Sequence, residues 1–166
     1  MTLLTPQIRA LEGQRRVYRA PEPIGAAAGR YFALAVGDDN PLYTDAGFAR
    51  EHGLAGVTIP LTLITETNQY AGLPIDADGY AGHSWEIEIA GTRRVRGGNT
   101  YTFERRIRPD DVVTATWEII ELAEKTTRSG ADMLVITSRA TYTDQDGDLL
   151  ATNVEQDIFV SLGSPA

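Results

Sequence analysis

The second half of the chain consists of strand-forming segments separated by short turns, and this pattern restricts the fold more than any other feature of the sequence. Residues 85–89 alternate strictly between apolar and acidic side chains, which is typical of a strand with one buried face. β-branched and aromatic residues predict further strands at 100–103, 112–122, 133–142 and 149–160. Turn-forming residues separate them, and the Asp-Gln-Asp-Gly sequence at 144–147 predicts a hairpin. These strands are therefore expected to form an antiparallel sheet.

Helices are expected only in the first half. A short strand at 15–19 is followed by Pro21 and Pro23, and proline favours the first turn of a helix. A helix is predicted over 24–36, ended by Gly37, with an apolar face formed by Ile24, Ala27, Ala28, Tyr31, Phe32 and Ala35. A short helix over 44–52, capped by Thr44 or Asp45, and a second long helix over 58–70 follow. Helices segregated from an antiparallel sheet indicate an α+β fold, and a sheet wrapped around a central helix fits these elements.

Length and composition exclude several classes of protein. The 166 residues suit one domain, 1–166, with its core at about 15–160. With no cysteine and only His52 and His83, the chain offers neither a disulfide framework nor a multi-histidine metal site. The net charge of −8 argues against a nucleic-acid partner. Because we find no membrane-spanning apolar run and no secretory signal, we expect a cytoplasmic protein with no membrane partner.

The segment from Tyr31 to Tyr43 carries the motif from which we infer the chemistry. It contains Gly-Asp-Asp-Asn-Pro-Leu-Tyr, which resembles the signature of MaoC-like (R)-specific enoyl-CoA hydratases and dehydratases, Gly-Asp-x-Asn-Pro-aliphatic-His. Every position matches except the histidine, which is Tyr43 in this chain. Residues 59–62, 96–103 and 106–112 resemble the FAS1-like dehydratase branch, also known as the MaoC N-terminal domain. The resemblance implies the hot-dog fold, in which an antiparallel sheet wraps around a central helix.

The resemblance also implies a reaction on an acyl thioester: hydration of a trans-2-enoyl group or dehydration of a 3-hydroxyacyl group. Such a lyase needs a base that activates water and hydrogen-bond donors for the thioester oxygen. By resemblance, Asp38 is the general base, Asn40 fixes the loop, Tyr43 assists the water, and the backbone N–H of Leu61 serves the oxygen. An unperturbed phenol has a pKa of about 10 and is a poor base at neutral pH, so Asp38 would act alone.

Six arginines lie between residues 93 and 108, a segment with a single acidic residue. Arginine binds phosphate in a bidentate manner, which suggests that Arg93, Arg94 and Arg96, with Gly97 and Gly98, bind the phosphates of coenzyme A. The alternatives are a solvated strand face or an acidic partner. No metal or redox cofactor is implied, because coenzyme A or the pantetheine of an acyl-carrier protein enters as part of the substrate.

Several functions remain open at this point. The chain can be a self-sufficient hydratase or dehydratase, or the subunit of a heteromer whose partner supplies the Asp/His dyad while this chain shapes the acyl channel. A hot-dog thioesterase and a stand-alone biosynthetic tailoring dehydratase or cyclase are further alternatives. The resemblance implies a homodimer or a heterodimer with a second MaoC-like chain. His83 would replace the missing imidazole only if the fold brought it to Asp38.

Overall fold

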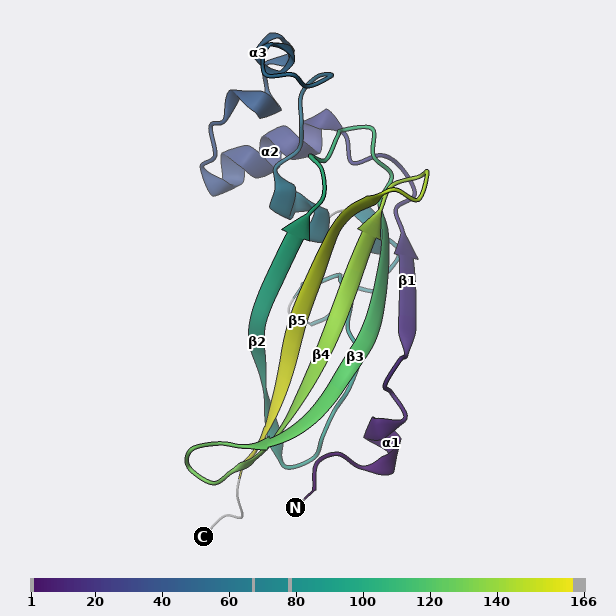
Figure 1. Ribbon diagram of the computed structural model, residues 1–166, viewed down its shortest axis with the longest axis vertical. Coiled ribbons are helices and arrows are strands. Elements are labelled where there is room, and N and C mark those ends of the chain that lie inside the picture. Colours follow the sequence, from purple (N-terminus) through teal and green to yellow (C-terminus); the bar gives the residue numbers. More distant parts are fainter. Residues whose placement is uncertain (1, 67, 78, 163–166) are drawn as a thin grey trace.

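A five-stranded antiparallel sheet is the main element of the computed structural model, which describes residues 2–66, 68–77 and 79–162 (Figure 1). The strand order is β1-β3-β4-β5-β2. The bounds are β1 (Arg15–Arg19), β2 (Thr92–Phe103), β3 (Thr114–Thr126), β4 (Asp132–Thr143) and β5 (Leu149–Ser161). Strands β3, β4 and β5 follow one another through tight turns, whereas β1 and β2 occupy the two edges. The predicted α+β fold is confirmed.

The helices α2 (Ala26–Val36) and α3 (Ala46–Glu51) lie at one end of the sheet, and α1 (Pro6–Arg9) lies at the other (Figure 1). The Asp45 carboxylate caps α3 by accepting hydrogen bonds from the N–H groups of Gly47 and Phe48. Gly37 ends α2 with a φ of 72°, a left-handed conformation that glycine adopts without steric cost. Both of these helix ends agree with the sequence prediction. In the described ranges, no helix is long and apolar enough to cross a membrane.

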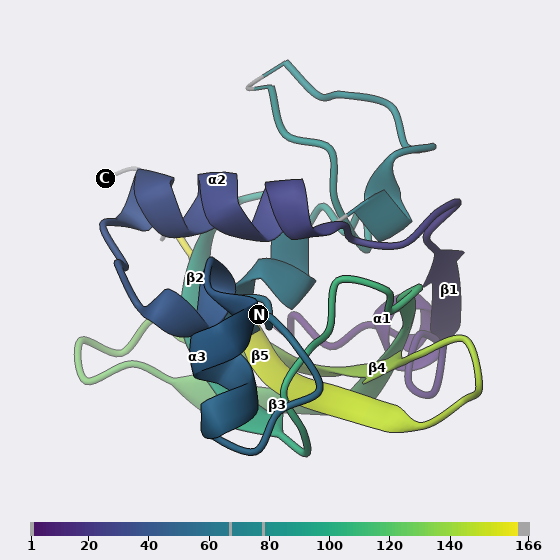
Figure 2. The ribbon, with the colours of Figure 1, turned by 90° about the horizontal axis from the view of Figure 1, so that it is seen from above.

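The prediction of a long second helix over 58–70 was wrong. The chain forms two short 3-10 helices there, Leu61–Glu66 and Asn68–Tyr70, while residue 67 lies outside the described residues. The Thr65 hydroxyl donates to the Thr62 carbonyl at 2.9 Å, and this local bond competes with regular helix hydrogen bonding. Leu63 and Ile64 are nevertheless buried on the sheet, so this segment covers the inner face and lies between the strands and α2 (Figure 2).

The predicted strand at 85–89 is also absent as regular structure. Trp85 is buried, and its indole N–H donates to the Ser138 hydroxyl at 2.8 Å, so the alternation correctly marked a half-buried segment. The backbone does not pair, however, because Glu86 has a φ of 56°, which interrupts an extended conformation. The strand residues predicted at 100–103 belong instead to the longer β2.

The buried face of α2 differs from the predicted apolar face. Gly29 and Ala33 are buried, whereas Tyr31 and Leu34 are 73% and 75% exposed. A Cβ atom added at Gly29 would lie 2.6 Å from Cδ1 of Ile59, so glycine allows α2 to approach the Ile59–Pro60 segment closely. Helical spacing located the helix but not the side that packs, because glycine contributes no apolar signal to the pattern.

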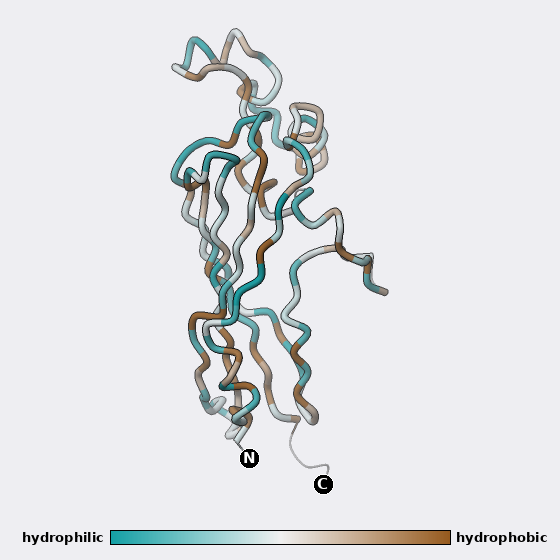
Figure 3. Tube along the Cα trace, turned by 90° about the vertical axis from the view of Figure 1, so that its right-hand side faces the viewer, coloured by the Kyte–Doolittle hydropathy of each residue, from teal (hydrophilic) through white to brown (hydrophobic). Residues whose placement is uncertain are grey.

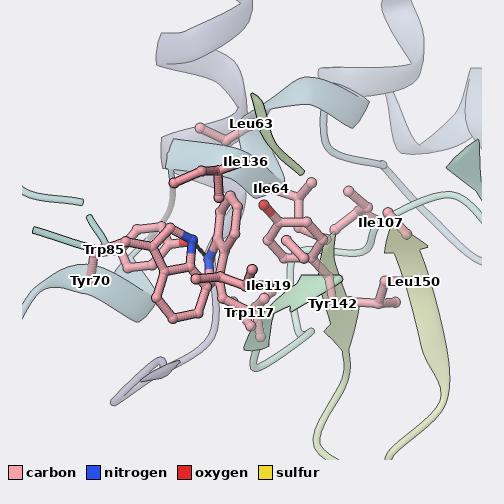
Figure 4. Close-up of a cluster of buried hydrophobic side chains, with 14 of the residues drawn as sticks. Leu63, Ile64, Tyr70, Trp85, Ile107, Trp117, Ile119, Ile136, Tyr142 and Leu150 are labelled. Carbon is pink, nitrogen blue, oxygen red and sulfur yellow. Dashed lines mark hydrogen bonds between the residues drawn. The ribbon is translucent and has the colours of Figure 1, made fainter. Parts of the chain in front are cut away.

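The main core fills the space between the inner face of the sheet and the covering segments. Hydrophobic and hydrophilic residues alternate along the strands, as expected for a sheet with one covered face (Figure 3). Tyr70, Trp85 and Trp117 pack together with Ile119 and Ile136 (Figure 4). The Trp117 indole N–H donates to the Tyr70 hydroxyl at 2.8 Å. Aromatic side chains therefore fill much of the core, and their polar atoms find partners inside it.

A charged cluster joins the turn before β3 to the hairpin between β4 and β5. The Arg105 guanidinium makes two 2.8 Å hydrogen bonds to the fully buried Asp111 carboxylate and one of 2.7 Å to Asp144. Asp144 also accepts the N–H groups of Asp146 and Asp148, which forms the predicted hairpin turn. The hydrogen bonds from Arg105 to Asp111 raise the pKa of this guanidinium above its usual range, so Arg105 stays charged.

His83 is enclosed by aromatic side chains. Its ring stacks on Trp117, with centroids 4.2 Å apart, and its Nδ1 is 3.0 Å from the Tyr18 hydroxyl. Burial, assisted by the positive charges of Arg16 and Arg94, lowers the pKa of His83 to about 3. The imidazole is therefore uncharged at neutral pH.

We expect Asp111→Ala to destabilise the fold by about 3 kcal/mol, because it removes two of the carboxylate hydrogen bonds of Arg105 and the acceptor of the Arg108 N–H. Asp110→Ala is the matched control, since Asp110 is exposed and lies 3.8 Å from Arg108, and its loss should cost about 0.5 kcal/mol or less. Urea unfolding at neutral pH measures both values. Equal effects of the two substitutions would contradict a structural role for the cluster.

His83 also predicts how stability depends on pH. The unfolded chain has a histidine pKa of about 6.5, above the folded value, so at pH values between the two only the unfolded state binds the proton. Stability should therefore fall by about 2 kcal/mol from this group between pH 7 and pH 5. Urea unfolding at both pH values should show this loss in the native chain and in the exposed-site control His52→Gln, but not in His83→Phe. If His83→Phe shows the same loss of stability, titratable groups other than His83 cause the pH dependence.

Candidate functional site

Three of the predicted site residues meet in the turn that follows α2. The Asp38 carboxylate accepts the N–H of Asn40 at 3.2 Å, and the Asn40 side-chain oxygen accepts the N–H of Leu42 at 3.0 Å. Such side-chain acceptors stabilise tight turns of this kind. Pro41 begins the short 3-10 helix Pro41–Tyr43, which Asn40 caps. The turn thereby brings Tyr43 back to Asp38, and the Tyr43 hydroxyl donates to Asp38 Oδ2 at 3.2 Å.

Tyr43 differs from Asp38 in its surroundings. Its ring is buried in a small cluster with Ala33, Leu42 and Ala49, whereas Asp38 is exposed. Burial raises the pKa of Tyr43, and so do the charge of Asp38 and the hydrogen bond to it, while the nearby Arg106 cation opposes this shift. Tyr43 therefore keeps its proton at neutral pH and acts as a hydrogen-bond donor to the carboxylate.

Leu61 lies on a segment that is tied to this turn. The Thr58 N–H donates to the Leu42 carbonyl, and the Ile59 N–H donates to the Ile107 carbonyl, both at 2.9 Å. Leu61 begins a 3-10 helix, and the first N–H groups of a helix have no partner within it. The role of the Leu61 N–H as a donor to a thioester oxygen stays a prediction.

A cavity of about 650 Å³ opens beside the segment that pairs with this turn. Its walls are residues 54–58 on one side and the arginine-bearing residues 105–110 on the other. The buried Thr58 hydroxyl lines the cavity and has no hydrogen-bond partner within the described part of the chain. The exposed Arg106 and the half-exposed Arg108 place cations on the opposite wall, where Arg108 also lies 3.8 Å from Asp110 and 3.5 Å from Asp111. The cavity therefore suits a ligand with anionic groups.

The arginines of β2 that were predicted to bind phosphate have other partners in two of three cases. Arg94 makes a two-point contact with Asp157 at 3.0 and 2.6 Å, and Arg96 lies 3.7 Å from Glu155. Arg93 is exposed. Close packing explains the glycine at position 97. A Cβ atom added there would lie 2.8 Å from Cβ of Gln156, at a bulge of β2. A phosphate-binding role for Arg93, Arg94, Arg96, Gly97 and Gly98 stays a prediction, and the geometry favours the later arginines.

The sequence contained a signal for these later residues. Arg105, Arg106 and Arg108 belong to the same arginine-rich run, but composition alone does not tell which arginines face a cavity. His83 does not take the place of the missing imidazole, since its contacts are Tyr18, Trp85 and Trp117 in another part of the fold. The turn offers the exposed carboxylates of Asp38 and Asp39, the protonated phenol of Tyr43 and, nearby, arginine cations.

Comparison with known proteins agrees with this geometry. Residues 13–153 match the family model described as the FAS1-like dehydratase domain region. A UPF0336 protein of Thermobifida fusca is 30% identical over 141 residues, covering 84% of this chain and 86% of that protein. A probable enoyl-CoA hydratase alpha subunit of Thermomonospora curvata is 28% identical over 81% of this chain, but the match spans only 44% of that relative.

Solved structures share the fold. The ChsH1–ChsH2 complex of Mycobacterium tuberculosis contains a chain that superposes with a TM-score of 0.72 and 21% identity, over 96% of this chain and 90% of that one. The MaoC-like dehydratase of Rhodospirillum rubrum superposes with a TM-score of 0.62 and 20% identity, over 92% and 94% of the two chains. The sheet described above is thus the hot-dog sheet of these structures, and the chain belongs to the FAS1-like dehydratase domain family.

Proposed function

We propose that this chain is the acyl-thioester-binding subunit of a MaoC-like hydratase or dehydratase, and that a second MaoC-like chain supplies the catalytic Asp/His dyad. The reaction is the interconversion of a trans-2-enoyl thioester and a 3-hydroxyacyl thioester. One observation carries the proposal: the Tyr43 hydroxyl donates to the Asp38 carboxylate at 3.2 Å, at the position where the family signature has histidine.

The hydrogen bonds of Asp38 argue against a complete active site in this chain. A dyad that activates water holds the water between its carboxylate and its imidazole. In this turn the Tyr43 hydroxyl bonds directly to one carboxylate oxygen, and the Asn40 N–H bonds to the other. Because Tyr43 keeps its proton, it cannot accept one from water at neutral pH. The pair thus stabilises the turn and has little capacity to act as a base.

The outer surface supports a partner chain. Strand β2 is an edge strand of 12 residues that pairs with β5 on one side, and long unpaired edges are usually covered in the functional assembly. Tyr31 and Leu34 of α2 are exposed apolar side chains, which are common where proteins associate. The similar ChsH1–ChsH2 structure is a complex of two chains, and the Thermomonospora relative is described as an alpha subunit. These likenesses favour a heteromer over a homodimer.

The substrate would be held by its phosphate-bearing handle in the cavity between residues 54–58 and 105–110. Arg106 and Arg108 provide guanidinium groups for the phosphates of coenzyme A or of carrier-protein pantetheine. Arg105 is less available, because Asp111 and Asp144 occupy its hydrogen-bond donors. The cavity lies beside the Leu42–Thr58 contact, so a bound thioester would pass close to the Asp38–Tyr43 turn.

A self-sufficient hydratase is the second candidate, and the exposure of Asp38 favours it. In that case Asp38 would remove the proton from water while Tyr43 donated a hydrogen bond. The thioesterase and the tailoring dehydratase or cyclase remain alternatives from the sequence, without a specific observation in their favour. They differ in product, since a thioesterase releases free thiol.

We expect the purified chain alone to leave the absorbance of crotonyl-CoA and of longer trans-2-enoyl-CoAs unchanged. Adding a MaoC-like chain that bears the Asp/His dyad should start turnover. Within that complex, Asp38→Asn in this chain should leave the rate within about twofold of the native rate, because the partner carries the chemistry.

Three outcomes would count against the heteromer proposal. Turnover by the chain alone that Asp38→Asn abolishes would establish the self-sufficient hydratase. Release of thiol in place of loss of the enoyl absorbance would establish a thioesterase. If calorimetry shows that the chain binds no acyl-CoA, an acyl thioester is not its substrate.

Tyr43 provides a second test of the same proposal. Tyr43→His restores the family signature and should give the isolated chain measurable hydration of crotonyl-CoA, which the further change Asp38→Asn should abolish. Tyr43→Phe is the control: it should stay inactive and lose about 1 kcal/mol of stability with the hydrogen bond. If Tyr43→His binds acyl-CoA as well as the native chain but shows no turnover, the turn does not correspond to the Asp/His site of the family.

A further inference from the structure

A second, smaller cavity lies on the inner face of the sheet, among residues that the proposed chemistry does not use. Its volume is about 110 Å³. One wall is formed by Thr65, Tyr70, Tyr80 and His83, and strands β2, β3, β4 and β5 form the other. The lining side chains that matter here are His83, Asn99, Tyr101, Trp117, Asn153 and Glu155. They come from segments far apart in the sequence, so the cavity exists only in the folded chain.

The sheet register explains why polar groups gather there. Trp117, Ala140, Asn153 and Tyr101 lie opposite one another in a row across four strands. Glu155 lies two residues after Asn153 on β5 and therefore points to the same face of the sheet, because side chains alternate along a strand. A bulge at residues 97–98 of β2 changes the alternation, so that both Arg96 and Asn99 line the cavity. The middle of an otherwise apolar face thus carries polar groups.

Two of these polar groups have unsatisfied hydrogen-bonding capacity. Asn153 is 1% exposed, and its amide donates to the Asn99 oxygen at 3.3 Å, but its own oxygen has no partner within the described part of the chain. The buried Nε2 atom of His83 also lacks a partner there, while Nδ1 faces the Tyr18 hydroxyl. Buried polar atoms in native proteins normally have partners, so a bound group is expected to supply them.

Size and charge restrict what this group can be. A benzene ring occupies an apolar protein cavity of about 150 Å³, so this cavity takes a smaller group of about four or five non-hydrogen atoms. Arg96 and Glu155 are the charged side chains among the described lining residues, and they lie 3.7 Å apart. Their charges offset each other, and His83 is uncharged at neutral pH. The lining therefore favours a neutral group over an ion.

We propose that this cavity binds a compact, uncharged, hydroxyl-bearing group, which in the proposed function is part of the acyl chain of the thioester. A hydroxyl group can donate a hydrogen bond to the Asn153 oxygen, and its own lone pairs can accept one from a donor in the lining. The inference about the cavity is independent of the proposed function, which enters only in assigning the hydroxyl to an acyl substrate. It predicts an oxygenated acyl group in place of a plain hydrocarbon.

Binding of matched acyl-CoAs tests this inference. Pairs of four to ten carbons, with and without a terminal hydroxyl, are titrated against the native chain while tryptophan fluorescence is recorded, since Trp117 lines the cavity. For at least one length, the hydroxylated member should bind about tenfold more tightly. Asn153→Leu and Asn153→Ala should both lose this preference. Leucine keeps the cavity filled and alanine enlarges it, so a loss in both variants points to the missing amide and not to a change of volume. Thr152→Val, on the opposite face of β5, should retain it, and thermal melts should show that all variants fold.

The outcomes separate this inference from the proposed function. Equal affinity within every pair, unchanged by the Asn153 variants, overturns the hydroxyl preference while leaving thioester binding intact. If neither member of any pair binds, the proposed function fails. In that case, 1,3-propanediol tests separately whether the cavity binds a hydroxyl-bearing group. A saturable fluorescence change with this diol in the native chain but not in Asn153→Leu supports the cavity as a binding site. No change in either protein means that only water occupies it.

Discussion

The buried ionic cluster of Arg105, Asp111 and Asp144 is the interaction on which the arrangement of the other elements depends. Asp111 also accepts the Arg108 N–H, and its carbonyl accepts the N–H of Ile24 just before α2. The neighbouring Ile107 carbonyl accepts the Ile59 N–H. A single turn between β2 and β3 therefore connects the start of α2, the segment that covers the sheet and the β4–β5 hairpin. The charges are costly to bury, and multiple hydrogen bonds offset this cost.

This turn also positions the groups that make the functional proposal possible. Arg106 and Arg108 extend from it into the large cavity, and Thr58 faces them from the segment that is bonded to Leu42. The Asp38–Tyr43 pair is thus linked to the arginine-lined wall through short backbone contacts. A subunit that binds the substrate handle but leaves proton transfer to its partner is consistent with a rigid turn whose carboxylate already has two donors.

The inner face of the sheet combines two environments. Aromatic and aliphatic side chains form most of the core, while the buried Asn153 places polar atoms on the same face and Asn99 and Glu155 lie beside it in the small cavity. Burial raises the pKa of Glu155 and lowers that of His83. Apolar side chains of similar size would stabilise such a position more, so the polar groups are better explained by a ligand than by packing.

The sequence by itself determined the strands β3, β4 and β5, the short β1, the ends of α2 and the hairpin at Asp144, because these depend on local alternation, turn residues and helix caps. It also placed Asp38, Asn40 and Tyr43 in one turn, since a tight turn at Pro41 leaves few ways to arrange six residues. Only the tertiary structure decided which face of α2 is buried, that residues 61–66 and 68–70 form 3-10 helices, and that residues 85–89 do not pair as a strand. It also decided which arginines face a cavity and that His83 and Asn153 line the same small cavity. These features depend on contacts between distant segments, whose energies outweigh local preference and leave no periodic signal in the chain.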